Sequence, residues 1–349
     1  MSSAEAAGAA LPGLDLVALT PWFAEHVGDV GDGITAEHIT GGKSNLTYRL
    51  RADGREYILR RPPVGTLLAT AHDMGREHRM MAALAETAVP VPVMYAFCDD
   101  ESVLGAPFYV MEAVEGTPYR RASELTARGT ERTRQISERL VDTLATLHAV
   151  DPAEVGLADF GRPQGYLQRQ VGRWRKQFDA SHTRELPDML TLYAALAERA
   201  AQVEVRSGSP AGIVHGDFRL DNVLFDNNDQ PTAVLDWELS TIGDSLTDLA
   251  LMGVYDTMGK LMPGAVSDVS AAPGYLSDEE VVARYASTST RDLSDFSFYT
   301  ALSWFKLAGI VEGIHYRYVN KQTVGEGFAG IGDGVFPLLS AGLAALNDH

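Results

Sequence analysis

The sequence has 349 residues, 45% of them hydrophobic and 22% charged, which supplies enough apolar material for one large two-lobed domain or two separate cores. A formal net charge of −18 excludes the basic surface that binds nucleic acid or an anionic membrane. The single cysteine, Cys98, excludes an internal disulfide and is expected to be a buried apolar side chain.

The first residues, Met1 to Gly13, carry no basic residue ahead of an apolar run, so they do not resemble a secretory signal. No stretch of the sequence approaches the roughly 20 apolar residues that a membrane span needs. A cytoplasmic protein without nucleic-acid or membrane partners is therefore expected.

The first third of the chain changes from helical to strand periodicity. Apolar residues recur at helical spacing from Leu14 to His26, and Thr20 with Pro21 resembles an N-cap followed by a first-turn proline. Asp53-Gly54 separates two strand-like runs and predicts a hairpin. The predicted order is three strands, a helix and two strands: Ile34–Thr40, Ser44–Arg51, Glu56–Arg61, Ala71–Glu86, Val93–Cys98 and Phe108–Val114. This order favours an antiparallel sheet with a helix packed against it.

Beyond Gly116 the pattern becomes mostly helical, with a short β-rich interruption from Ile213 to Trp237. The predicted helices are Glu131–Ala149, Tyr166–Phe178, Leu190–Val205, Ser245–Tyr255, Asp278–Ala286 and Asp292–Tyr318. On the last helix, Trp304 and Phe305 are expected to be core residues. Lys306, Glu312 and Arg317 are expected to face either the cleft or solvent, and solvent is the favoured environment. The sequence thus predicts an α+β fold with a small antiparallel-sheet lobe at 1–111, a connection at 112–116 and a mostly helical lobe at 117–349.

The most informative segment contains His215-Gly216-Asp217, with Asn222 five residues after the aspartate. About ten residues further on, a short apolar strand delivers Asp236. Phosphoryl transfer needs a carboxylate beside the attacking hydroxyl and oxygen ligands that hold Mg²⁺ against the phosphates. An Asp and an Asn on one loop, with a second Asp ending a strand, supply these groups.

This segment resembles the catalytic loop of the aminoglycoside phosphotransferase-like family, a branch of the protein-kinase-like superfamily. The continuation from Thr241 to Ala250 is similar to the same family, and the resemblance spans about Ile34 to Tyr318. It implies a protein-kinase-like two-lobed fold with Asp217 as the catalytic base and with Asn222 and Asp236 as magnesium ligands. By the same resemblance, His215 and Asp248 brace the loop, whereas Glu238 is either an outer group of the site or an ordinary solvated or hydrogen-bonded glutamate.

The N-terminal part is expected to hold ATP. The run Gly41-Gly42-Lys43-Ser44-Asn45 looks like the family's loop over the phosphates, in which glycine permits close approach and turn amides donate to phosphate oxygen. Kinases also use a strand lysine that contacts the phosphates and pairs with a helix glutamate. Here Arg60 occupies the strand position and Glu77 lies on the following helix, whereas the family commonly has lysine in place of Arg60.

The segment from Phe108 to Gly116 resembles the family's hinge between the lobes. The resemblance implies that Met111 lines the adenine pocket and that the Glu112 carbonyl and the Val114 amide bond the adenine edge. Only eleven residues separate Asp236 from Asp248, which leaves no room for the activation segment of a protein kinase. The predicted acceptor is therefore the hydroxyl group of a small molecule.

Several functional alternatives remain open from the sequence. The run Leu59-Arg-Arg-Pro-Pro63, together with the run from Asp236 to Asp244, looks closer to the kinase domains found beside acyl-CoA dehydrogenases, which suggests a hydroxylated acyl thioester. The basic residue Arg173 suits a CoA phosphate. An aminoglycoside-modifying enzyme, a nucleotide-binding pseudokinase and a nucleotidyl-transferring relative are the other readings.

Overall fold

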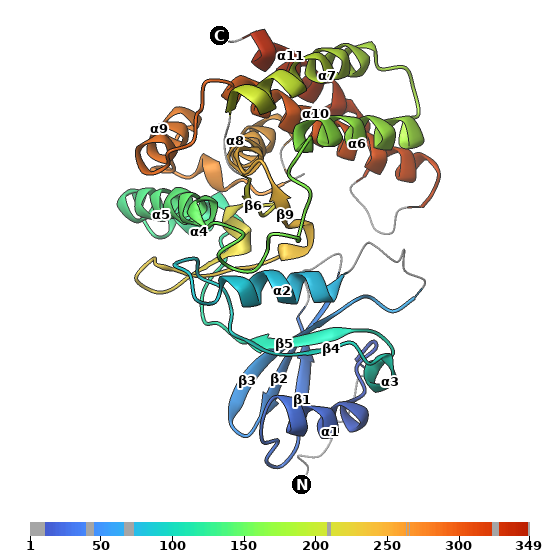
Figure 1. The fold of residues 1–349 in the computed structure, drawn as a ribbon, viewed down its shortest axis with the longest axis vertical. Helices are drawn as coiled ribbons and strands as arrows, with labels where there is room; N and C mark the ends of the chain where they lie inside the picture. The colour runs from blue at the N-terminus through green and yellow to red at the C-terminus, as the bar shows by residue number, and fades with distance from the viewer. Residues whose placement is uncertain are drawn as a thin grey trace. The chain divides into compact units, whose positions relative to one another are not determined.

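The structure is a computed structural model that describes residues 11–39, 45–65, 73–207, 211–262, 264, 266–322 and 328–347 (Figure 1). Contacts divide the chain into two units, Met1–Gly116 with Thr232–Glu238 and Thr117–Pro231 with Leu239–His349. The sequence places 232–238 in the helical lobe, but this segment groups with the first unit. The reason is local bonding, because the Val234 amide donates to the Pro90 carbonyl at 2.8 Å and the Thr232 hydroxyl donates to the Glu115 carbonyl at 3.1 Å.

The first unit contains a five-stranded antiparallel sheet, as the sequence predicts. Its strand order is β1-β2-β3-β5-β4, so β5 pairs with β3 in the interior of the sheet and β4 forms the edge. The strands are β1 (Thr35–His38), β2 (Leu46–Ala52), β3 (Arg55–Arg61), β4 (Met94–Cys98) and β5 (Phe108–Glu112). Strand β3 therefore has β2 on one side and β5 on the other, which places its side chains at the middle of the sheet.

The turn between β2 and β3 is the predicted two-residue hairpin, since Ala52 pairs with Arg55. Asp53 and Gly54 both have positive φ, 46° and 69°, as the twist of a tight hairpin requires. Asparagine, aspartate and glycine tolerate this conformation best, so the local sequence and the turn agree.

The Gly54→Ala variant is expected to unfold about 1 kcal/mol more easily than the wild type, because a Cβ disfavours the left-handed region. Nothing lies within 4 Å of the place where that Cβ would sit, so the cost comes from the backbone alone. Urea denaturation measures it. Gly172→Ala, also in open space but inside a helix, is the control and should stabilise the protein instead. Equal effects at both positions would contradict the hairpin conformation.

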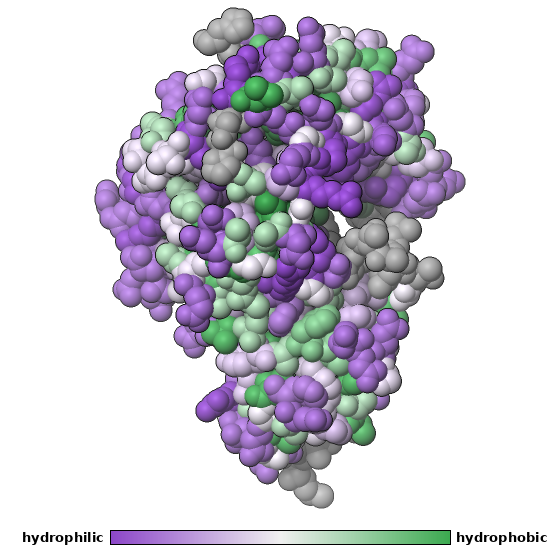
Figure 2. Space-filling view, viewed as in Figure 1, coloured by the Kyte–Doolittle hydropathy of each residue, from purple (hydrophilic) through white to green (hydrophobic). Residues whose placement is uncertain are grey.

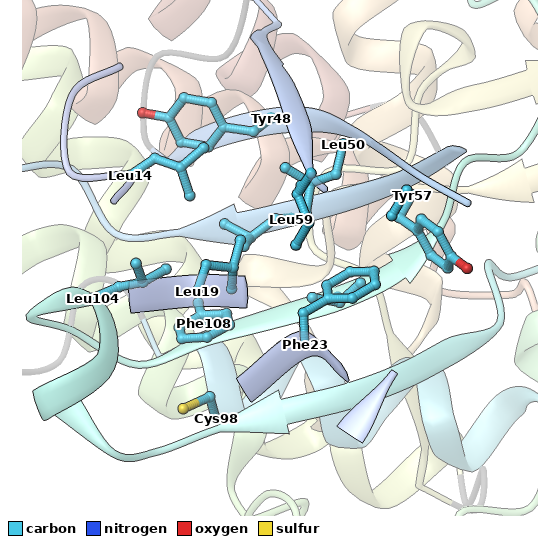
Figure 3. Close-up of a cluster of buried hydrophobic side chains, with 13 residues drawn as sticks. Leu14, Leu19, Phe23, Tyr48, Leu50, Tyr57, Leu59, Cys98, Leu104 and Phe108 are labelled. Atoms are coloured by element: carbon cyan, nitrogen blue, oxygen red, sulfur yellow. The ribbon is translucent and has the colours of Figure 1, made fainter. Parts of the chain in front are cut away.

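The core of the first unit lies between the sheet and helix α1 (Leu16–His26). Leu19 and Phe23 of α1 meet Leu50, Leu59 and other buried side chains of the sheet (Figure 3). Cys98 is 3% exposed within this cluster, as predicted for a small apolar side chain. Because side chains alternate along a strand, the residues of β3 and β5 that do not enter this cluster point to the other face, where helix α2 (Met74–Leu84) contacts β4 and β5.

The helical run predicted from Leu14 to His26 is present as α1, but Thr20 is not its N-cap. Asp15 is the N-cap, and its carboxylate accepts from the Val17 and Ala18 amides at 2.9 and 3.2 Å. Thr20 lies inside the helix and donates its hydroxyl to the Leu16 carbonyl at 2.7 Å. Pro21 is tolerated because it lies on an exposed side of the second turn. A short helix α3 (Glu101–Leu104), not predicted from the sequence, lies in the connection between β4 and β5.

The second unit is mostly helical, and all six predicted helices are present in it with altered ends. They are α5 (Thr130–Ala149), α6 (Tyr166–Ser181), α7 (Pro187–Ser207), α8 (Leu246–Leu261), α9 (Asp278–Thr288) and α10 (Phe296–Val319). Helices α4 (Ala122–Thr126) and α11 (Val335–Asn347) were not predicted. Helix α10 contacts α6, α7, α8 and α11, which explains why most of its side chains are buried.

Short strands interrupt the helices where the sequence predicts β structure. Strand β6 (Gly212–Val214) pairs antiparallel with β9 (Thr241–Gly243), and β7 (Val223–Phe225) and β8 (Pro231–Val234) follow the loop that begins at His215. Hydrophilic residues predominate on the visible surface of the helical unit, with smaller apolar areas among them (Figure 2). Within the described ranges, none of the helices has the length and apolar character needed to cross a membrane.

Candidate active site

Arg60 of β3 is the centre of a charged cluster in the first unit. Its guanidinium lies 2.7 Å from the Asp236 carboxylate, 3.5 Å from Glu77 and 3.5 Å from Glu238. Burial alone lowers the pKa of Arg60, but Tyr109 and the nearby carboxylates outweigh it and the pKa is raised. Arg61 points to the opposite face, as strand alternation predicts, and donates to the Leu104 carbonyl at 2.8 Å.

Glu77 joins α2 to this cluster. Its carboxylate is 1% exposed and accepts from the Tyr109 hydroxyl at 2.9 Å and the Asn45 amide at 3.2 Å. Burial raises the pKa of Glu77 to about 7, although Arg60 and Tyr109 act in the opposite direction. The predicted pairing of a strand cation with a helix glutamate is thus present, with arginine as the cation.

Asn45 and Glu238 complete the cluster. The Asn45 amide also donates to Glu238 at 3.2 Å, so Glu238 is a bonded member of this group rather than a solvated glutamate. Three carboxylates therefore surround one guanidinium, and the cluster carries a net negative charge when all of them are ionised. A site of this kind gains stability from an additional cation.

Asp236 has a backbone conformation that non-glycine residues seldom adopt, with φ at 65°. Its side chain is 35% exposed, and one of its two carboxylate oxygens accepts a hydrogen bond from Arg60. Unusual backbone of this kind persists where surrounding contacts enforce it, and it is common at ligand-binding positions.

In the second unit, the loop after β6 is fixed by a buried carboxylate. Asp248 of α8 accepts from the His215 amide at 2.6 Å and from the Gly216 amide at 2.8 Å. His148 lies 3.5 Å from the same carboxylate. Burial alone raises the pKa of Asp248, but the bonds with His148 and His215 lower it overall. Gly216 has φ of 89°, and a Cβ there would lie 2.7 Å from Leu239, so only glycine fits.

Asp217 and Asn222 are brought together by this loop. The Asn222 amide donates to the Asp217 main-chain carbonyl at 2.8 Å and to its Oδ2 at 3.2 Å. The Asp217 Oδ1 atom is buried and accepts no hydrogen bond from the described residues. A buried carboxylate oxygen without a donor is costly unless a ligand supplies one. An acceptor hydroxyl is such a donor.

Three further side chains surround the loop. Arg219 Nε lies 3.6 Å from Asp217 Oδ1, too far for a hydrogen bond, and the Arg219 guanidinium lies 2.8 Å from Asp221. Burial, followed by the Asp217 charge, raises the pKa of Tyr255. Lys306 of α10 donates to the Gly216 carbonyl at 3.1 Å, so the expectation that it faces solvent is wrong. Its helix is buried on nearly every side, which brings the lysine to the loop.

Comparison with known proteins now decides the family. Residues 35–284 match APH, the phosphotransferase enzyme family. The chain belongs to this family. The acyl-CoA dehydrogenase family member 11 of Rattus norvegicus is 35% identical over 338 residues, which cover 94% of the chain and 43% of that protein. The chain thus spans less than half the length of this curated relative.

Solved structures support the same assignment. A Ralstonia eutropha protein assigned as an aminoglycoside phosphotransferase has a TM-score of 0.82 at 33% identity, with 95% of this chain and 98% of that chain covered. A thermostable mutant of aminoglycoside phosphotransferase APH(4)-Ia, in ternary complex with ADP and hygromycin B, has a TM-score of 0.57 at 14% identity, covering 95% and 98%. The fold is the predicted protein-kinase-like α+β fold, and the chain belongs to a family of phosphotransferase enzymes.

The remaining predicted nucleotide residues of this APH chain fall into two groups. Gly41, Gly42 and Ser44 lie outside the described residues. Met111 and Glu112 end β5, and Met111 shares the face of that strand with Tyr109, the partner of Glu77. Glu112 also fixes β4 to β5, since its amide donates to the Val93 carbonyl at 2.8 Å and its carboxylate accepts from the Val93 amide at 3.1 Å. Val114 follows just after the strand.

Asn222 and Asp236 offer oxygen atoms of the kind that magnesium prefers. Within the described ranges, no group of three or more His, Cys, Asp or Glu side chains has the arrangement of a metal cage. A magnesium ion that binds together with phosphate usually takes only one or two protein carboxylates. Asn222 uses its amide nitrogen for Asp217, which leaves its carbonyl oxygen for other partners, and Asp236 is partly exposed. These hard oxygen atoms fit the ion.

Sequence reasoning missed Arg219, Tyr255 and the position of Lys306. Arg219 could have been found, because it lies two residues after Asp217 in the motif itself. A lone lysine within an apolar helical run was the available signal for Lys306. No local signal identified Tyr255. Glu312 was also misplaced, since it is buried and accepts from Thr183 and Arg184 at 2.9 Å each.

A second acid in the APH chain has unusual protonation. Asp256 of α8 lies beside Tyr255 and Tyr275 at a small cavity, and burial raises the pKa of its carboxyl to about 8, with a contribution from Asp278. Because this folded-state value is above the ordinary 3.8, the protonated form stabilises the fold. The stabilisation is complete below about pH 4 and is lost as the pH rises through about 8.

The wild type is therefore expected to lose stability over this pH range more steeply than Asp256→Asn, by at most about 1.4 kcal/mol per pH unit. Urea denaturation at several pH values measures the difference. Asp188→Asn, at an exposed position of α7, is the control and should follow the wild type. Parallel pH profiles for the wild type and Asp256→Asn would show that Asp256 is ionised in the fold.

Proposed function

We propose that this chain is a small-molecule kinase that transfers the γ-phosphate of ATP to an acceptor hydroxyl in the presence of Mg²⁺. The observation that carries the proposal is the buried Asp217 Oδ1, which accepts no hydrogen bond from the described residues and adjoins Asn222. The match to the phosphotransferase family and the ADP in the APH(4)-Ia complex support it.

In the proposed reaction, Asp217 accepts the proton of the acceptor hydroxyl as its oxygen attacks the γ-phosphorus. The new oxygen–phosphorus bond forms while the bond to ADP breaks. Asn222 holds the Asp217 carboxylate in place for this step. A positioned base of this kind contributes about 10²- to 10⁴-fold to a rate.

The other residues hold ATP and the metal. We assign Asn222 and Asp236 as the residues that would hold magnesium, which when bound would neutralise charge on the phosphates. Arg60 is assigned to the phosphates together with Gly41, Gly42, Ser44 and Asn45, and Glu77 orients it. The planar guanidinium of arginine can donate two hydrogen bonds to a phosphate, and it carries the same positive charge as the lysine that the family commonly has. Met111 and the main chain at Glu112 and Val114 are assigned to adenine.

The proposed acceptor is a hydroxyacyl-CoA or a related hydroxy compound. The rat relative is named an acyl-CoA dehydrogenase family member, and the match covers 43% of it. A segment similar to this chain therefore occurs in a protein that is named for acyl-CoA. An aminoglycoside acceptor is the second candidate, because hygromycin B is bound in the APH(4)-Ia complex. A pseudokinase is less favoured, since Asp217, Asn222 and Asp236 are all present.

The test is magnesium-dependent ATP consumption across hydroxyacyl-CoAs, aminoglycosides, amino alcohols and sugars, with Asp217→Asn as the blank. Product mass separates a gain of phosphate from a gain of AMP, and thereby kinase from nucleotidyl transfer. Activity that disappears in the variant supports the proposal. ATP binding without turnover of any compound would support a pseudokinase instead.

A further inference from the structure

A polar cavity adjoins the catalytic loop within the second unit. It is lined by Gly216 of the loop and by side chains of α6, α8 and α10, and its volume is about 40 Å³. The empty space there, open solvent included, is about 350 Å³. A cavity of this size holds a few water molecules or a small polar group such as a carboxylate.

Lys306 is the cation of this cavity. Its ammonium donates to the Gly216 carbonyl at 3.1 Å and lies 5.7 Å from the centre of the Trp174 ring. These described partners are a carbonyl and a ring rather than a carboxylate. An ammonium has three hydrogens to donate, so the two contacts leave donor capacity toward the cavity.

The electrostatic environment of Lys306 favours an additional negative partner. Burial lowers its pKa, and the charges of Asp217 and Asp248 act in the opposite direction. Asp248 lines the cavity, but its oxygens already accept from two loop amides. The other polar side chains of the lining, Tyr166, Gln170, Thr247 and Ser303, are neutral. A buried ammonium is stabilised by a bond to an oxygen that carries full or partial negative charge.

Resting on the proposed kinase function, we infer that Lys306 binds a carboxylate or carbonyl oxygen of the acceptor and so determines which hydroxyl compounds are phosphorylated. Gly216 both lines the cavity and precedes Asp217 in the chain, so an acceptor held by Lys306 presents a neighbouring hydroxyl to the base. A polycationic aminoglycoside meets like charge at this position, which disfavours it.

The first test compares acceptors on the wild-type protein. Short- and medium-chain hydroxyacyl-CoAs and free hydroxy acids are each paired with the diol that lacks the carbonyl group, and kanamycin is included. The expected result is a kcat/KM about 10- to 100-fold higher for the carbonyl member of a pair, as for loss of a hydrogen bond to a charged group. Equal use of the diols, or a preference for kanamycin, overturns the inference while the kinase assignment stands.

The second test uses Lys306→Met and Lys306→Gln, with Lys260→Met at an exposed position of α8 as the control. Both Lys306 variants are expected to raise the KM for the carbonyl acceptor about 10- to 100-fold, with the KM for ATP and the diol kinetics unchanged. A loss of kcat for every acceptor alike means that Lys306 only supports the loop, and this overturns the inference. Circular dichroism verifies that each variant folds. No turnover of any compound by the wild type overturns the kinase assignment, and the inference with it.

Discussion

Replacing Asp217 with asparagine is expected to lower kcat by about 10²- to 10⁴-fold and to leave the KM for ATP close to the wild-type value. Asparagine has the shape of aspartate and keeps an oxygen for the bond from Asn222. It cannot take the proton of the acceptor hydroxyl, so the loss falls on the chemical step. Steady-state kinetics with both substrates varied separate the two constants.

The control for this variant is Asp188→Asn, which removes a carboxylate at an exposed position of the same unit. Its turnover should match that of the wild type. Near wild-type turnover in Asp217→Asn would refute the base assignment. Equal losses in ATP affinity and turnover would show that Asp217 acts on nucleotide binding rather than on the hydroxyl.

The second large effect is expected at Asp236. Asp236→Ala should weaken magnesium-dependent ATP binding by at least about 100-fold, the upper end of the loss seen when even an outer partner of a metal site is removed. The variant removes both an assigned metal ligand and the 2.7 Å partner of Arg60. Calorimetric titration with ATP, with and without Mg²⁺, measures the change.

The comparison with and without the metal distinguishes these two causes. A loss confined to the magnesium condition supports metal ligation, whereas an equal loss in both conditions indicates that Asp236 only positions Arg60. Unchanged binding in both would exclude Asp236 from the site. Asp99→Ala, at an exposed position of the first unit, is the control and should bind ATP as the wild type does.

Local signals in the sequence were sufficient for most of the first unit. The Asp53-Gly54 pair predicts the hairpin because two adjacent residues with positive φ fix both the turn and the register of the strands that it joins. The start of α1 was misplaced because Thr20-Pro21 also has the pattern of a helix start, and only the packing of Leu19 and Phe23 decides in favour of Asp15. Where a sequence pattern fits two possible helix starts, the packing of the core decides which one the chain adopts.

The second unit was harder to predict where helices are short or lack a polar face. Helix α4 has five residues, too few for a periodic pattern. Helix α11 follows a glycine-rich stretch, has a proline at its third position and is apolar on most sides, so neither its start nor its buried face is marked in the sequence. Its packing against α10 supplies what the local sequence lacks.

The residues of the candidate site also differ in how far they could be predicted from the sequence. Asp217 and Asn222 could be paired from the sequence because Asn222 follows five positions after Asp217 on one loop. Lys306 is 90 residues from its partner Gly216, and that contact depends on how α10 packs within the unit. Long-range contacts of this kind arise from tertiary packing, which periodicity and motif spacing do not encode.

The assignment of Thr232–Glu238 to the first unit has a consequence for biosynthesis. When Gly116 has been made, the ribosome must still add 122 residues before Glu238 exists, which takes on the order of 10 s at typical elongation rates. During that interval the nascent chain holds Arg60 without Asp236 and Asn45 without Glu238. The charged cluster around Arg60 is therefore completed only after Glu238 has been added to the chain.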